Sequence, residues 1–260
     1  MSAELRPPSR TAKLGLVLFG VTVALLAGEA LVRATRGPYD DRIRAFADAA
    51  VVPDAALSHR LRPGARVVIA GIEYRVSSLG TRGPEPADAP AFRVVVLGDS
   101  VTMGWGVAED DTWPARVGAS LASRAPDIEM IDAAVLGWGI EEHCARFDEL
   151  ARSLDPDLVI VGYFPNDPEG TDAVVAGRGL RSELFALLAA RLASASGTSR
   201  ATEHERALHA EGSPGWATVQ RSFTRLGARC REEHIPCAIA LLPSLTESPY
   251  PLQPEHRRLA

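Results

Sequence analysis

Three residues of the chain, each placed shortly after an apolar run, have side chains or backbone amides suited to acyl transfer. Ser100 follows Gly98-Asp99, Gly137 lies in the sequence LGWGI, and Asn166 lies in PNDPE. A serine hydroxyl can attack an ester carbonyl, and fixed amide donors can stabilise the oxyanion that then develops. The carboxyl ends of parallel strands meet at one edge of a sheet, where ligands bind in open α/β folds. We therefore expect the three residues to converge at one site.

The expected roles follow from residue type. Ser100 is the candidate nucleophile, and the amides of Ser100 and Gly137 and the side chain of Asn166 are the candidate oxyanion donors. Asp99 is expected to brace the turn that carries the serine. Trp105 and Trp138 lie in the nucleophile and glycine loops, so two interpretations stay open for them: lining an acyl pocket or ordinary packing.

From Phe92 onward the chain alternates between apolar runs and helical patterns, as in a parallel α/β fold. Strands are expected near 93–97, 128–135, 157–164 and 237–243, with helices over 109–125, 141–154 and 215–235. Residues 171–212 are rich in Ala and Arg and are expected to form two inserted helices. Right-handed crossovers between the strands give a three-layer α/β/α sandwich with a parallel sheet.

The N-terminus predicts a membrane segment. Arg6, Arg10 and Lys13 precede the apolar stretch 14–34, which is close to the length that crosses a bilayer. Positive charge before the span predicts a cytoplasmic tail, residues 1–13, with the rest of the chain outside, in the periplasm of a bacterium. A cleaved signal and a buried soluble helix remain as alternatives. Residues 35–91 are expected to be a connector with a small hairpin around Gly71, acting as a spacer, and 92–260 the catalytic domain.

Composition narrows the classes of function. The 260-residue chain has a formal net charge of −5 and no stripe of basic residues, which argues against a nucleic-acid partner. Its three cysteines form no C-x-x-C pair, so nothing in their spacing supports a zinc-ribbon or thioredoxin-like site. Cys230 and Cys237 can form a disulfide in an oxidising compartment or stay as buried thiols. The acidic run 109–111 is better explained as the start of a helix than as a metal site, because carboxylates at a helix N-terminus interact favourably with the helix dipole.

The chain resembles the SGNH/GDSL hydrolase superfamily in three blocks. The first block is resembled by VVVLGDSVTMGWGV, which implies that Ser100 is the nucleophile. The second is resembled by IDAAVLGWGIEE, which implies that Gly137 is the oxyanion glycine. The third is resembled by VIVGYFPNDPE, which implies that Asn166 is the oxyanion asparagine. Asp132 stands where many relatives have Asn. The sequence SSLGTRGPE, residues 77–85, is similar to one found in membrane-anchored bacterial members. The resemblance implies a flavodoxin-like fold and hydrolysis of esters or thioesters without a metal or cofactor.

The fourth block of that superfamily, D-x-x-H, which supplies the general base, does not occur after Asn166. The chain has six histidines. His143, His204, His209 and His234 fall on or near helices and are expected at the surface, while His59 precedes the domain and His256 is a weak candidate base. We expect a domain that is incomplete at its C-terminus rather than one that has lost catalysis.

Three functions remain open. They are a membrane-anchored serine esterase of the lipase-like type, an O-acetyltransferase or deacetylase of envelope polysaccharide, and a catalytically dead module that binds sugar or lipid. The expected partners are accordingly a small-molecule, glycan or lipid ester and, through the N-terminal segment, the membrane.

Overall fold

The computed structural model describes residues 9–35, 38–124, 127–170, 182, 184–185, 199–244 and 253–259. The chain divides into two compact units. Residues 1–40 and 180–197 form the first, and residues 41–179 and 198–260 form the second.

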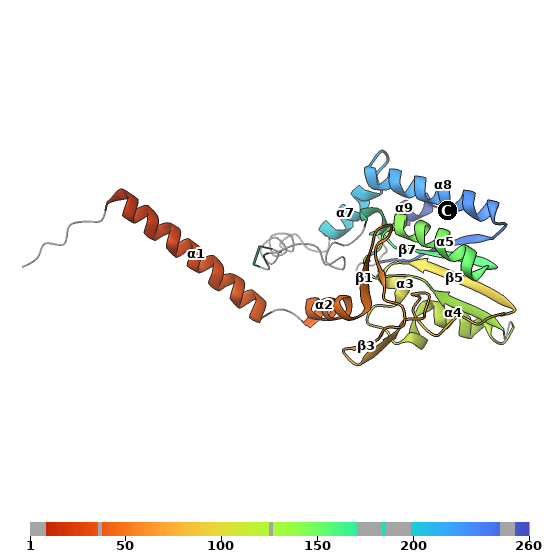
Figure 1. Ribbon diagram of the computed structural model, residues 1–260. Helices are drawn as coiled ribbons and strands as arrows, with labels where there is room; N and C mark the ends of the chain where they lie inside the picture. The colour runs from red at the N-terminus through yellow and green to blue at the C-terminus, as the bar shows by residue number, and fades with distance from the viewer. Residues whose placement is uncertain are drawn as a thin grey trace, which may run out of the picture. The chain divides into compact units, whose positions relative to one another are not determined.

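The second unit is built on a parallel sheet of four strands (Figure 1). The strands are β5 (Phe92–Gly98), β6 (Ile128–Asp132), β7 (Leu158–Tyr163) and β8 (Cys237–Leu241), in the spatial order β6-β5-β7-β8. All three pairings are parallel, and Gly98, the last residue of β5, lies opposite Gly162, the last but one of β7. The parallel sheet expected from the apolar runs is therefore confirmed.

Helices cover both faces of this sheet (Figure 1). On one face, α5 (Ile140–Leu154) and α8 (Pro214–Glu232) pack against Val95, Leu97 and Val161. On the other face, α4 (Trp113–Leu121) lies on β6, with Gly118 directly over Met130. Central strands buried from both sides need apolar residues on both faces, which explains their continuous apolar runs. The fold class is α/β with three layers.

The helix expected over 109–125 is two elements. Glu109–Asp111 forms a short 3₁₀ turn, and α4 begins only at Trp113, where the Thr112 side chain accepts from the Ala115 amide. Pro114 sits in the first turn of α4, where its missing N–H costs nothing. The acidic residues therefore precede the helix rather than opening it.

The connector differs from the expected spacer. It contains α2 (Pro38–Ala50) and two antiparallel hairpins, β1–β2 (Val51–Asp54, Ser58–Leu61) and β3–β4 (Arg66–Ile69, Ile72–Arg75). The second hairpin turns at Gly71, as the sequence predicts. However, Phe46, Tyr74 and Val76 share one buried cluster with Met103 and Trp138 of the α/β domain. Their apolar side chains are buried against the loops at the sheet edge, so from Phe46 to Val76 the connector contributes to the core of this unit and is more than a spacer.

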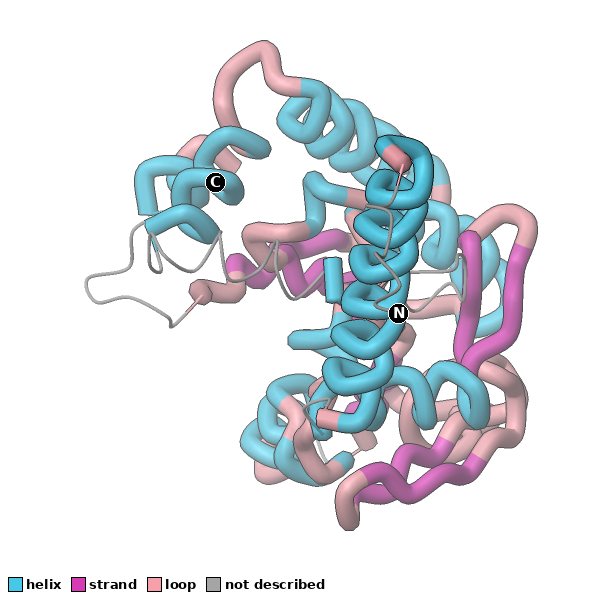
Figure 2. The backbone as a smooth tube through the Cα atoms, turned by 90° about the vertical axis from the view of Figure 1, so that its left-hand side faces the viewer, coloured by secondary structure: helices cyan, strands magenta, loops and turns pink. Residues whose placement is uncertain are grey.

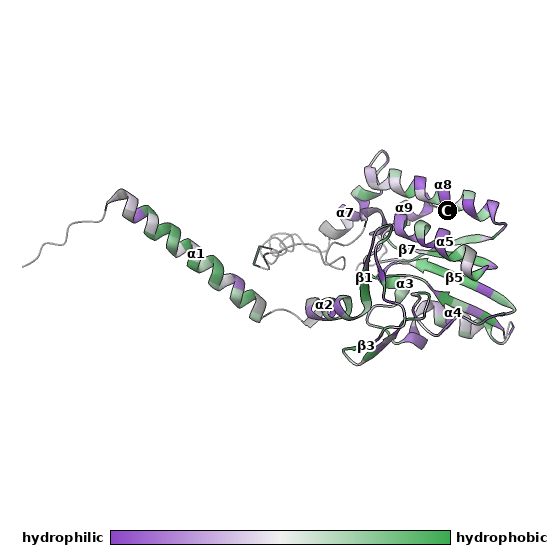
Figure 3. Cartoon of the chain, viewed as in Figure 1, coloured by the Kyte–Doolittle hydropathy of each residue, from purple (hydrophilic) through white to green (hydrophobic). Residues whose placement is uncertain are grey.

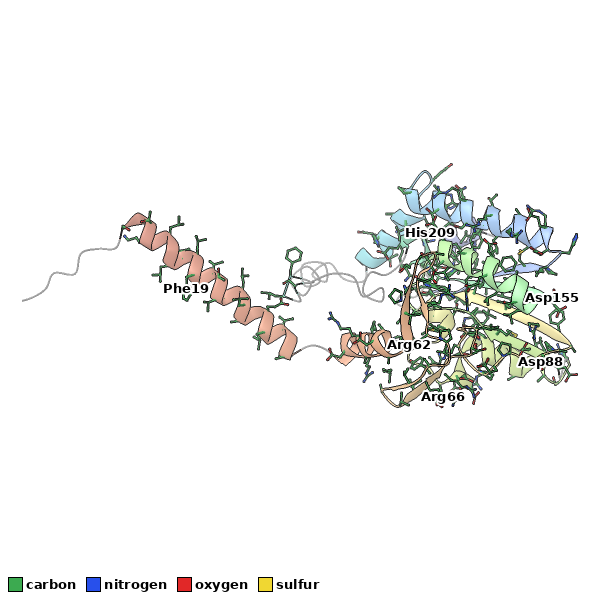
Figure 4. All side chains as sticks on the ribbon, viewed as in Figure 1. Phe19, Arg62, Arg66, Asp88, Asp155 and His209 are labelled. Carbon is green, nitrogen blue, oxygen red and sulfur yellow. The ribbon has the colours of Figure 1, made fainter. Side chains whose placement is uncertain are left out.

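The first unit contains α1 (Arg10–Ala34), one continuous helix (Figure 2). It is apolar along its length (Figure 3), and Lys13–Val32 has the length and hydropathy to cross a membrane. None of that span is buried, and the Phe19 side chain is 68% exposed (Figure 4). These properties favour an anchor or signal over a buried soluble helix.

Most of the insertion expected over 171–212 lies outside the described residues. Within it, α7 (Ser199–Leu208) is described as a helix. A last short helix, α9 (Gln253–Arg257), follows β8 in the sequence.

Candidate active site

Ser100 lies where β5 ends and a one-turn helix, α3 (Ser100–Met103), begins. The Asp99 side chain caps this helix by accepting from the Val101 amide at 2.9 Å. It also accepts from the Ser100 hydroxyl, with 3.4 Å between Oγ and Oδ2. Asp99 is 1% exposed, so these hydrogen bonds hold the turn from its buried side.

Two glycines let α3 sit directly on the sheet. A Cβ at Gly98 would lie 2.3 Å from Thr102 Oγ1, and one at Gly162, on the neighbouring strand, would lie 2.2 Å from the same atom. Real Cβ atoms do not come this close to other atoms, so any larger residue would lift α3. The glycine at the end of each central strand is thus what seats the helix that carries Ser100.

The loops that carry Gly137 and Asn166 reach the same edge. The Val135 amide donates to the Gly98 carbonyl at 3.1 Å, so the chain stays beside β5 until two residues before Gly137. A Cβ at Gly139 would lie 2.8 Å from the Asp167 carbonyl oxygen. The second and third loops are therefore in direct contact, and both adjoin the strand that ends at Ser100.

The candidate donors face solvent rather than the core. Asn166 is exposed, and Ser100 and Gly137 are partly exposed. Gly137 has φ +81°, a conformation that glycine adopts without strain. Among the described residues, the amides of Ser100 and Gly137 donate no hydrogen bond within the protein.

Two buried carboxyl groups lie beneath the site. Burial raises the pKa of Asp99 to about 6. Burial also raises the pKa of Asp167 well above its ordinary value, and the nearby charge of Asp99 adds to that rise. Asp167 accepts from the Phe164 amide at 3.0 Å and lies 3.9 Å from Nδ1 of His143. The electrostatic effect of one carboxyl on the other indicates that the first and third loops are close together.

No histidine in the described part of the chain, which includes all six, hydrogen-bonds to Ser100. His143 is completely buried, and burial lowers its pKa to about 3. His209 is also buried, with Nε2 2.8 Å from the Tyr163 hydroxyl, and the His256 ring packs 6.0 Å from the Tyr163 ring. The expected surface position is therefore wrong for His143 and His209, which fill core space between helices and sheet.

The two tryptophans pack rather than line an open pocket. Trp138 is 2% exposed, and its indole N–H donates to the His59 carbonyl at 2.9 Å. Trp105 stacks on Tyr74 with 5.5 Å between ring centroids and meets Phe46 edge-on. These contacts favour the packing interpretation for both residues.

Asp132 and the three cysteines are the remaining residues that the sequence singles out. Asp132 is buried at the end of β6, where its Oδ1 accepts from the Ala134 amide at 3.1 Å. Burial raises its pKa to about 7. Cys230 and Cys237 are free thiols, the first buried and the second exposed, and Cys144 is a third, buried thiol.

The residues that sequence reasoning missed come from the connector. Tyr74 accepts from the Gly106 amide at 2.8 Å, and Arg82 donates to three carbonyl groups of the loop 103–107. Both therefore contact the loop that follows the nucleophile helix. For Arg82 the signal in the sequence is SSLGTRGPE, residues 77–85, which resembles a segment of membrane-anchored bacterial members but by itself indicates no role for the arginine; Tyr74 lies outside that segment.

Comparison with known proteins gives one curated relative and several solved structures. An arylesterase of Vibrio mimicus is 28% identical over 81 residues, which are 31% of this chain and 40% of that protein. TesA is 16% identical, with a TM-score of 0.38 over 58% of this chain and 61% of its own. AlinE4, an SGNH-hydrolase family esterase, is 16% identical, with a TM-score of 0.37 over 59% and 60%.

A lipolytic protein of the G-D-S-L family from Desulfitobacterium hafniense is 18% identical, with a TM-score of 0.39 over 64% and 66%. No family model matches the chain. The chain resembles the SGNH/GDSL hydrolases. It spans less than half of the curated arylesterase and about three fifths of the first solved structures. The activities of these SGNH-type proteins therefore bear on this chain only as proposals.

Proposed function

We propose that the chain acts on ester bonds by forming an acyl-enzyme at Ser100. The observation that carries this proposal is the placement of Ser100 at the start of α3, directly after the central strand β5. There Ser100 is partly exposed, while the turn that carries it is fixed by the buried Asp99. A nucleophile held at this edge, with its own amide beside it, suits attack on a carbonyl.

The proposed oxyanion donors are the Ser100 amide, the Gly137 amide and the Asn166 side chain. The contacts between their loops and the lack of internal partners for the two amides, among the described residues, support this assignment. Donors fixed before reaction cost no reorganisation when charge develops, which is why such sites accelerate acyl transfer. Asp99 and Asp167 act beneath them by holding the first and third loops.

Proton removal from Ser100 limits the rate of this chain. A serine without a neighbouring base is a weak nucleophile near neutral pH, and none of the histidines in the described residues hydrogen-bonds to Ser100. An oxyanion site alone still leaves catalysis of roughly 10³ to 10⁴ over water in a serine hydrolase stripped of its triad. We therefore expect slow but Ser100-dependent turnover of activated esters.

The test is release of chromophore from a short-chain nitrophenyl ester by the full chain. Ser100→Ala should abolish the release above background, and Asn166→Ala should lower it by about 10²-fold, as loss of one oxyanion donor does. Ser120→Ala, at an exposed serine of α4, is the matched control and should change nothing. Equal release by Ser100→Ala and the parent chain would refute the proposal and favour the binding-module alternative.

The same acyl-serine serves hydrolysis or transfer, and only the acceptor differs. Adding an envelope polysaccharide to the assay separates the two. Acyl transfer to sugar hydroxyls that depends on Ser100 identifies an O-acyltransferase, whereas unchanged release into water identifies an esterase or deacetylase.

We further propose that α1 anchors the protein in a membrane with the α/β domain on the extracytoplasmic side. The exposed apolar face of Lys13–Val32 supports this, together with Arg6, Arg10 and Lys13, which precede or open the span. An ester substrate of the cell envelope would then be within reach of the domain.

A further inference from the structure

Arg82 is a buried cation that joins the connector to the loop after the nucleophile. It is 5% exposed, and burial lowers its pKa from the ordinary value. One guanidinium nitrogen, Nη1, donates to the carbonyl groups of Met103 and Gly104, the latter at 2.8 Å. The other, Nη2, donates to the Val107 carbonyl at 2.6 Å. One side chain thus holds the whole loop 103–107 by its backbone.

The surroundings fix the guanidinium itself. Its central carbon lies 4.6 Å from the centroid of the Tyr74 ring, within the range of a cation–π contact. The Arg82 amide donates to the Asp132 carbonyl at 2.8 Å, which ties the residue to the end of β6. Gly104 leaves room for the contact, because a Cβ there would lie 3.0 Å from Nη1 and 2.5 Å from Thr112.

The helix that carries Ser100 needs such a support. α3 is a single turn of four residues, too short to be stable by its own hydrogen bonds. Its first residues are held by the Asp99 cap, and its last residue, Met103, is held by Arg82. The partial negative charge of a helix C-terminus favours a cation at that position. These two contacts therefore hold α3 at both of its ends.

We propose that Arg82 is a positioning residue for the nucleophile. It fixes the loop 103–107, and through it α3 and Ser100, against the end of β6 from which the Gly137 loop departs. The proposal rests on the proposed function, because positioning matters only if Ser100 reacts. It gives the sequence SSLGTRGPE a role within the active site, although these residues lie in the segment that follows the membrane helix.

The test compares Arg82→Lys and Arg82→Ala with the parent chain in reaction with a fluorophosphonate. Lysine keeps the charge but lacks the planar fork that reaches three carbonyl groups. The saturating rate of phosphonylation should fall by about 10- to 100-fold in both variants, because small displacements of reacting groups have effects of that size. The half-saturating concentration of reagent should stay the same. Arg66→Lys, at an exposed arginine of β3, is the matched control.

Hydrogen exchange of the backbone amides, measured well below the melting temperatures, reports on local structure in the same variants. Exchange over 99–107 should become faster, and exchange over 113–121 should not change. The proposal would be overturned if the phosphonylation rate fell only in proportion to the fraction of unfolded protein. It would also be overturned if Arg82→Lys had the phosphonylation rate and the hydrogen exchange of the parent chain. If the parent chain is not modified at Ser100, the proposed function fails. If exchange over 99–107 is unchanged in Arg82→Ala, the positioning role of Arg82 fails.

Discussion

At the scale of single residues, the site includes buried carboxyl groups whose pKa values lie above the ordinary value for aspartate. Asp99 and Asp132 lie at the ends of adjacent strands, and burial raises the pKa of the first to about 6 and of the second to about 7. A carboxyl that is protonated in the folded chain and ionised in the unfolded chain makes stability fall as pH rises. For Asp132 this fall extends from about pH 4, near the unfolded pKa, to about pH 7.

Asp132→Asn should remove this dependence while keeping an oxygen for the Ala134 amide. The variant should match the parent below about pH 4 and then exceed its free energy of unfolding by an increasing amount, reaching about 4 kcal/mol near pH 7. Asp99, Asp167 and His143 titrate alike in both proteins, so the difference isolates Asp132. Chemical denaturation from pH 4 to 8 measures it, with exposed Asp110→Asn as control. A constant difference across this range would contradict the prediction.

At the scale of elements, the nucleophile helix depends on space left by strand-ending glycines. Gly162→Ala forces a methyl group to within 2.2 Å of Thr102 Oγ1 and 3.1 Å of the Trp113 ring. Overpacking of this kind destabilises by about 1–3 kcal/mol. Thr102→Ala in the same chain should restore part of the loss, because it removes the nearest clashing atom.

Thermal unfolding measures both effects. Gly227→Ala in α8 is the matched control, because the nearest atom to its added methyl group is 3.5 Å away and alanine favours a helix. Gly162→Ala with the stability of the parent chain, or no recovery in the double variant, would show that α3 is not seated on the sheet as described.

The strands and the three polar loops could be predicted because their signals are local. Val94 to Leu97 is apolar without interruption since both faces are covered, and Ser100 follows within the same short stretch. The role of Arg82 could not be predicted in this way, because its partners lie about twenty residues further along the chain. Likewise, His143 lies on an amphipathic helix, and only the packing of α5 shows that its ring faces inward.

At the scale of the whole molecule, the proposed topology can be tested with a native thiol. Cys237 is exposed, whereas Cys144 and Cys230 are buried. In intact spheroplasts of a bacterial host, treated first with a membrane-impermeant reductant to open any Cys230–Cys237 disulfide, a membrane-impermeant maleimide should modify the full chain at Cys237, and Cys237→Ser should abolish the reaction. Modification that requires lysis of the cells would place the α/β domain in the cytoplasm and contradict the proposed orientation.

The central claim is that Ser100 is a nucleophile with an oxyanion site beside it. Its most direct test is the mass of the full chain after reaction with a fluorophosphonate, followed by mapping of the modified peptide. We predict a single adduct on Ser100 in the parent chain, none in Ser100→Ala, and the parent result in the control Ser120→Ala. An adduct that persists in Ser100→Ala, or the absence of any adduct on the folded parent chain, would contradict the account.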